Sequence, residues 1–212
     1  FYADRPPSIE PVVTDLEFWV SAIMPADPRE DGLMPFVVRQ YEMLDQRLRA
    51  EGLGVRMVCS RGPMTVASYL MGILPLMEGL ALDPDGVGHV LDVISTTIIR
   101  WLHAQLDVLH APEGIMLLDD LVGMVSLRHY HTIIEPHLLR IFDEFEGLIR
   151  IYHNDTPCEH LLPALAEAHF DVFNFSHETD IAAAKAAMGH RVALMGNVAP
   201  LDLGVRGSPD EV

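Results

Sequence analysis

The chain has 212 residues, half of them hydrophobic, and a formal net charge of −17 with only 14 Lys and Arg. This length and apolar content suffice for one sizeable core. Nucleic-acid binding needs clustered basic residues, and no apolar run reaches the roughly 18–20 residues that span a bilayer. We therefore expect neither a nucleic-acid partner nor a membrane partner. The two cysteines, Cys59 and Cys158, indicate no disulfide framework and favour a cytoplasmic location.

Both ends of the chain look internal to a longer protein. Residue 1 is Phe, and the last six residues, 207–212, have the composition of a helix start. Ser208 suits the N-cap and Pro209 the first helical position. We therefore interpret the chain as an internal fragment.

Helical spacing alternates with short apolar runs along the chain. Residues 1–35 are rich in Pro and acids, with one short apolar patch at residues 18–24. Helices are predicted over Pro35–Glu51, Thr65–Leu76, Asp83–His110, Ser126–Phe145, Pro157–Ala168 and Asp180–Met188. Strands are predicted over Val55–Ser60, Gly114–Leu118, Leu148–Tyr152, Phe170–Phe175 and Arg191–Met195.

A reactive or turn-forming group follows each predicted strand. β/α repeats of this kind give parallel sheets through right-handed connections. Chemistry at the carboxyl ends of successive parallel strands is typical of a β/α-barrel enzyme. The fold class is therefore predicted as α/β, a (β/α)8 TIM-type barrel present as an incomplete fragment of about five units. An open doubly wound sheet is the alternative, but the sequence has no Gly-rich phosphate loop to support it.

Four segments in order carry a family resemblance, and they lie at Gly62–Leu70, Asp119–Ser126, His153–Asp155 and Val192–Pro200. From residue 61 onward the chain resembles the uroporphyrinogen decarboxylase superfamily, which contains the haem-pathway decarboxylase and the corrinoid-linked methyltransferases. The resemblance implies a full-length barrel of which this chain holds the third to seventh strands. Residues 1–54 would then be a connector and helices before the third strand, and residues 55–212 a partial barrel.

His153 and Asp155 are the sharpest pair of candidate residues. Residues i and i+2 of a strand point to the same side, so both side chains could face one ion. Imidazole and carboxylate are acceptable zinc ligands. The resemblance implies a zinc site here, because the methyltransferases carry His-x-Cys at this place. Asp155 departs from that pattern, and a hydrogen-bonded His–Asp pair that orients a loop is the alternative. Cys158 is either a replacement ligand or a buried thiol.

Asp119 and Asp120 end a buried strand, and alternation sends one to the barrel mouth and the other to the surrounding layer. We expect Asp119 at the mouth, as a catalytic residue with His153 and Asp155. The remaining substrate-binding candidates are Arg61, Tyr69, Asp120, His177 and Asn197. Arg61 could pair with a substrate carboxylate. Tyr69 matches a tyrosine near substrate in the decarboxylases, and Asn197 suits either the site or a tight turn.

The resemblance leaves three functions open. The first is corrinoid-linked methyl transfer with a zinc-activated acceptor and a separate corrinoid protein as partner. The second is metal-independent decarboxylation of a tetrapyrrole substrate, with no cofactor. The third is a non-catalytic corrinoid-binding barrel. His153 stands where the methyltransferases have a metal ligand, so we favour methyl transfer; the oligomeric state stays open.

Overall fold

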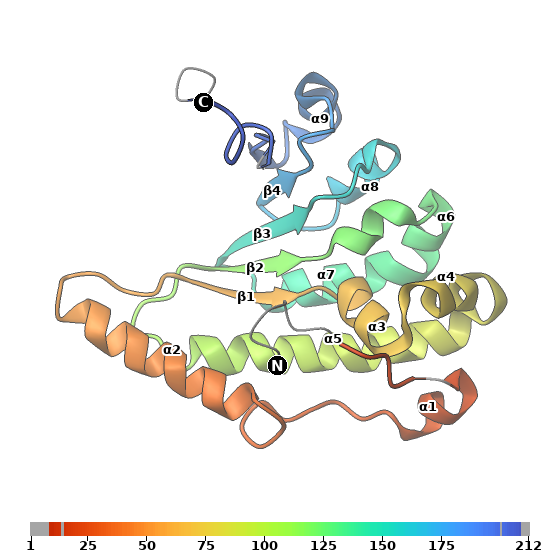
Figure 1. Ribbon diagram of the computed structural model, residues 1–212, viewed down its shortest axis with the longest axis horizontal. Helices are drawn as coiled ribbons and strands as arrows, with labels where there is room; N and C mark the ends of the chain where they lie inside the picture. Colours follow the sequence, from red (N-terminus) through yellow and green to blue (C-terminus); the bar gives the residue numbers. More distant parts are fainter. Residues whose placement is uncertain (1–8, 14, 200, 209–212) are drawn as a thin grey trace.

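Five parallel strands form one sheet in the order β1-β2-β3-β4-β5 in the computed structural model, which describes residues 9–13, 15–199 and 201–208 (Figure 1). Each strand pairs with the next one along the chain. The strands are β1 (Met57–Arg61), β2 (Gly114–Leu118), β3 (Ile149–Asn154), β4 (Val172–Phe175) and β5 (Ala193–Met195). This confirms the predicted α/β fold of consecutive β/α units.

The helices alternate with the strands. They are α1 (Leu16–Ala22), α2 (Met34–Arg49), α3 (Pro63–Met71), α4 (Ile73–Leu82), α5 (Pro84–Leu106), α6 (Leu127–His129), α7 (Glu135–Glu144), α8 (Leu162–Leu165) and α9 (Ile181–Met188). Short 3₁₀ turns lie at Asp120–Met124 and Glu159–Leu161, and a π-helical turn at Tyr130–Ile134. The division at residue 54 stays a prediction, and the helix start expected at the C-terminus falls mostly on residues 209–212, outside the described part.

Several predicted helices differ from the observed ones. The single helix predicted over Thr65–Leu76 is two helices, because Gly72 lies between them with φ of 88° and α4 leaves α3 at 108°. A left-handed φ of this kind ends a helix and favours glycine. The long helix α5 ends at Leu106 rather than near His110. The predicted Pro157–Ala168 helix is reduced to a 3₁₀ turn and the single turn of α8.

Side-chain N-caps start two of the predicted helices. The Asp83 carboxylate accepts a hydrogen bond from the backbone N–H of Gly86 at 3.0 Å and starts α5. The Ser126 hydroxyl accepts one from the N–H of His129 at 3.2 Å. Each cap satisfies one of the N–H groups that a helix start leaves without a partner. The helix that Ser126 starts is interrupted by the π-helical turn before α7.

The core lies between the outer face of the sheet and the helices. Most strand residues that point outward are buried there, and four aromatic side chains pack against one another in this layer: Phe142, Tyr152, Phe170 and Phe173. The other face of the strands, the inner face, is more open: Ile149 is 47% exposed and Met195 40% exposed. The inner face therefore leads to the strand ends where the polar candidates lie.

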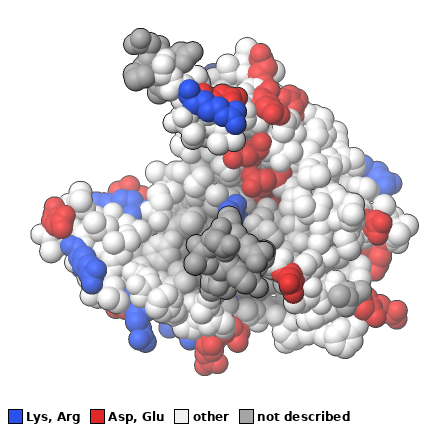
Figure 2. Space-filling model, in the orientation of Figure 1, with Lys and Arg blue, Asp and Glu red and all other residues white. Residues whose placement is uncertain are grey.

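Acidic side chains outnumber basic ones on the face drawn in Figure 2, and the basic ones stand apart from each other. No single helix among the described residues is long and apolar enough to cross a membrane. In the described part of the chain, the bent pair α3–α4 is the one helix pair that reaches that length and composition together.

Candidate metal and substrate site

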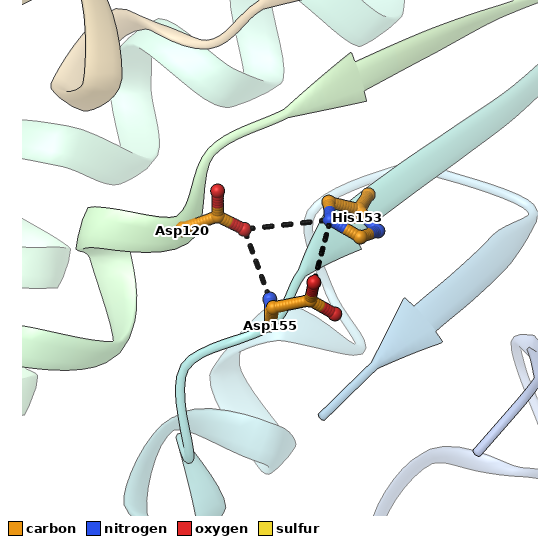
Figure 3. Close-up of side chains that lie close together, drawn as sticks. All are labelled: Asp120, His153 and Asp155. Atoms are coloured by element: carbon orange, nitrogen blue, oxygen red, sulfur yellow. Dashed lines mark hydrogen bonds and ion pairs between the residues drawn. The ribbon is translucent and has the colours of Figure 1, made fainter. Parts of the chain in front are cut away.

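Three side chains converge at the carboxyl end of β2 and β3: Asp120, His153 and Asp155 (Figure 3). The Nε2 atom of His153 lies 3.5 Å from Oδ1 of Asp120 and 3.5 Å from Oδ2 of Asp155. The backbone N–H of Asp155 donates to Oδ1 of Asp120 at 3.0 Å. One ligand atom from each residue lies within 4.8 Å of the other two. We call this group the Asp–His–Asp cluster.

The register of the sheet creates this cluster. Leu118 of β2 pairs with His153 of β3, and paired residues of parallel strands point to the same face. Asp120 and Asp155 follow the ends of these two strands, and the hydrogen bond between them holds both beside the imidazole. β3 extends to Asn154, two residues beyond the predicted end, so His153 is held rigidly inside the strand.

Asn174 of β4 fixes the orientation of the imidazole. Its Oδ1 atom lies 2.5 Å from Nδ1 of His153, and its Nδ2 donates to the carbonyl of Met195 at 2.8 Å. Because the amide nitrogen already donates to β5, the amide oxygen must be the acceptor, so Nδ1 of His153 carries the proton. Nε2 then faces the two carboxylates and carries the lone pair when the ring is neutral. A partner on the far nitrogen is the usual arrangement around a metal-binding histidine.

Two distances within the cluster match those of a tetrahedral zinc site. Ligand atoms at 2.0–2.2 Å from zinc in tetrahedral geometry are about 3.4 Å apart. Both distances from His153 Nε2 to a carboxylate oxygen are 3.5 Å, close to that value. Two neighbouring carboxylates repel each other, and a divalent ion would neutralise both. Arg61 lies beside them, with its Nη1 3.8 Å from Oδ2 of Asp120.

Asp119 and Asp120 have the reverse of the expected orientation. Asp119 is fully buried, and its carboxylate accepts hydrogen bonds from the N–H groups of Thr65 at 2.7 Å and Met64 at 3.2 Å. It therefore holds the start of α3 instead of facing the mouth. Burial raises the pKa of Asp119 to about 7, against the lowering effect of the hydrogen bonds from Thr65 and Met64. A side chain at Gly62 would overlap with Asp119, which explains the glycine at that place.

The remaining candidates are not members of the cluster. Tyr69 on α3 is 38% exposed, and His177 is exposed on the loop after β4. The side-chain amide of Asn197 donates to the carbonyls of Ser176 at 2.9 Å and Thr179 at 2.8 Å, so it holds that loop in place. Cys158 is buried and is not a member of the cluster, and burial raises the pKa of its thiol to about 12.

Sequence reasoning did not identify Asn174 as a site residue. The signal was present: Asn174 is the polar residue in a strand, Val172–Phe175, whose other members are apolar. Strand alternation alone could not show that it faces His153, because that needed the pairing of β3 with β4, in which His153 and Asn174 are opposite each other.

A sequence profile described as uroporphyrinogen decarboxylase (URO-D) matches residues 1–212. The chain belongs to the uroporphyrinogen decarboxylase family. Among curated relatives it is 26% identical to the uroporphyrinogen decarboxylase of Thermus thermophilus, over 93% of this chain and 57% of that protein. It is also 26% identical to that of Salmonella dublin, over 82% of this chain and 51% of that protein. The chain thus spans about half the length of these relatives.

A solved structure described as a methyltransferase from Methanosarcina mazei is also similar. It superposes with a TM-score of 0.83 over 98% of this chain and 60% of that one, at 22% sequence identity. At this identity the likeness bears on the fold. The curated relatives and the solved structure thus carry the names of two different activities.

Proposed function

We propose that this protein catalyses corrinoid-linked methyl transfer at a zinc ion held by the Asp–His–Asp cluster. The observation that carries the proposal is the position of His153 Nε2, which the Asn174 hydrogen bond turns toward Asp120 and Asp155. A metal-free decarboxylase has no evident use for an imidazole prepared in this way. The partner in this proposal is a separate corrinoid protein, and the location is cytoplasmic, in keeping with two unpaired cysteines.

His153 and Asp155 are the predicted ligands, and the geometry adds Asp120 from the neighbouring strand. When bound, zinc supplies Lewis acidity that polarises a group on the substrate. The protein residues hold the ion, and Asn174 keeps the imidazole in its binding tautomer. Arg61 lies next to Asp120 and can bind an anionic part of the substrate.

The ligand set indicates which substrate group the metal would polarise. Asp155 stands where the resemblance implies a cysteine, so oxygen replaces sulfur beside His153. One nitrogen and two oxygens form a harder set than thiolates, and a harder set suits an oxygen-containing group. We therefore propose polarisation of a methyl donor through its oxygen in preference to activation of a thiol acceptor.

Decarboxylation of a tetrapyrrole is the second candidate, and the names of the curated relatives favour it. In that reaction Arg61 and Tyr69 would bind the carboxylate groups of the substrate, and no metal would be needed. A non-catalytic corrinoid-binding barrel is the third candidate, and it would bind cobalamin without zinc and without turnover.

The deciding experiment is metal analysis of the protein expressed from its complete gene, by inductively coupled plasma mass spectrometry. We expect about one zinc per chain, lost in His153→Ala and retained in His110→Ala. His110 is the matched control because it is an exposed histidine before β2, at the opposite end of the sheet. A methyl-cobalamin assay on both variants should then show loss of activity only in His153→Ala.

Zinc-free protein in all three samples would contradict the proposal. Turnover of uroporphyrinogen by the zinc-free protein would then establish the second candidate. Cobalamin binding without zinc and without either reaction would establish the third.

A further inference from the structure

A largely apolar cavity of about 520 Å³ lies beside the end of β1. Its walls come from α1, the segment that follows α1, α3 and α5, and they include Trp19, Val66, Leu70, Val93 and Trp101. Small-molecule sites in proteins have volumes of about 300–1,000 Å³ and are mostly apolar with a few polar groups. The cavity therefore has the size and character to bind a ring compound.

Arg61 connects this cavity to the Asp–His–Asp cluster. It lines the cavity, and its Nη1 lies 3.8 Å from Oδ2 of Asp120, whose other oxygen lies 3.5 Å from His153. At 3.8 Å the charges attract without a well-formed hydrogen bond, and the Arg61 side chain is 49% exposed. Ion pairs as exposed as this are weak, so an anionic ligand can compete for the guanidinium.

The two side-chain hydroxyls in the lining, on Ser60 and Thr97, already have hydrogen-bond partners. The Thr97 hydroxyl donates to the carbonyl of Val93 and accepts from the N–H of Ala26, and the Ser60 hydroxyl donates to the carbonyl of Arg61. Arg61 thus carries the only full charge in the described lining. The complementary ligand has an apolar body and one anionic or electron-rich end.

We propose that this cavity binds the apolar body of the substrate, and that Arg61 binds its anionic end next to the Asp–His–Asp cluster. The substrate class is a carboxylate or similar anion on a ring-sized apolar body. The assignment of this ligand as substrate rests on the proposed function, but its binding does not require the metal. Substrate identity and metal binding can therefore be tested separately.

Both tryptophans of the chain line the cavity, so intrinsic fluorescence reports its occupancy. The probe is 4-tert-butylbenzoate, with uncharged 4-tert-butylbenzamide as its matched compound. The protein expressed from its complete gene should show a saturable fluorescence change with the benzoate. Arg61→Met should weaken the benzoate about tenfold, the effect expected for losing one charge-assisted contact, and should leave the benzamide unchanged.

Two cavity-filling variants test the place of binding. Val66→Phe on α3 and Val93→Phe on α5 should each weaken both probes about tenfold, because the added ring occupies the cavity. Ile181→Phe on the exposed side of α9 is the control and should bind normally. A cooperative thermal unfolding transition shows that a variant is folded. If one of the two filling variants does not fold, the other one provides the test.

His153→Ala separates this inference from the proposed function, because it should lose zinc and keep the benzoate affinity. If the wild-type protein is isolated without zinc and still gives a saturable change, ligand binding in the cavity is supported. The missing zinc then contradicts methyl transfer at zinc. No saturable change in zinc-containing protein, or a change that both filling variants retain, would overturn the inference and leave the proposed function standing.

Discussion

The two faces of the sheet follow opposite rules although they are built from the same strands. On the outer face, Ile115, Leu117, Tyr152 and Phe173 are fully buried against the helices. On the inner face, the neighbouring residues Leu118, His153 and Asn174 are only partly buried, and polar side chains lie at the carboxyl ends of the strands. Adjacent residues Asp119 and Asp120 show the contrast at one point, since one supports a helix and the other faces His153. A residue that stabilises the fold and a residue of the candidate site are thus adjacent in the sequence.

The largest expected effect is on the outer face. Phe173→Ala should lower the free energy of unfolding by about 3–5 kcal/mol, because it empties an aromatic stack with ring centroids 5.9 Å from Tyr152 and 5.7 Å from Phe175. Val172→Ala, the preceding residue on the inner face, should cost about 1 kcal/mol or less. Urea denaturation of both variants measures the difference, and equal losses would contradict the division between faces.

The second prediction compares the two adjacent carboxylates. Asp119→Ala should cost about 2–4 kcal/mol, since it leaves the buried N–H groups of Met64 and Thr65 without acceptors. Asp120→Ala should cost less than about 1 kcal/mol, because Asp120 is partly exposed. Zinc content should differ in the opposite way: Asp120→Ala should lose zinc, and folded Asp119→Ala should keep it. A stable Asp119→Ala protein would refute the supporting role of Asp119.

The third prediction concerns the residue that orients the imidazole. Asn174→Leu should weaken zinc binding by about 10–100-fold, the usual effect of removing the partner of a metal-binding histidine. Competition with a chromogenic chelator measures this affinity. Val172→Ala on the same inner face should change it less than about twofold. Unaltered affinity in Asn174→Leu would show that His153 does not need its partner.

The smallest effect is expected from Arg150 and Asp171, a side-chain pair between β3 and β4. Hydrogen bonds from Arg150 lower the pKa of Asp171, so the pair stabilises the fold above the ordinary carboxyl pKa and loses that effect as pH falls through the lowered value. Asp171→Asn should cost about 1 kcal/mol or less at pH 7 and nothing in strong acid. Asp202→Asn, from an exposed pair, should cost about 0.3 kcal/mol or less. A pH-independent difference would contradict the ionic origin.

The sequence was sufficient for the order and type of the strands, because apolar runs followed by turn residues are a strong local signal. It failed where the outcome depended on neighbours. Gly72 read as part of a helix, and only the packing of α4 gives it a left-handed φ. The run Gly114–Leu118 is apolar at every position, so it offers no alternation to show which of Asp119 and Asp120 faces inward.

The candidate site was partly foreseen for the same reason. His153 and Asp155 lie in one segment, and their proximity follows from strand geometry. The third member, Asp120, and the orienting residue, Asn174, come from other strands and depend on register. The sequence near a strand does not show its register with a parallel neighbour. The connecting segment with its helix can accommodate different registers.

The double use of the Asn174 amide has a mechanical consequence. One end of this side chain accepts from His153 and the other donates to the carbonyl of Met195 in β5. If β5 slides or separates from β4, the amide can rotate, and the imidazole then loses its fixed tautomer. Within the described chain, β5 is an edge strand that pairs with β4 alone. The orientation of the His153 imidazole therefore depends, through two hydrogen bonds, on the pairing of the edge strand β5 with β4.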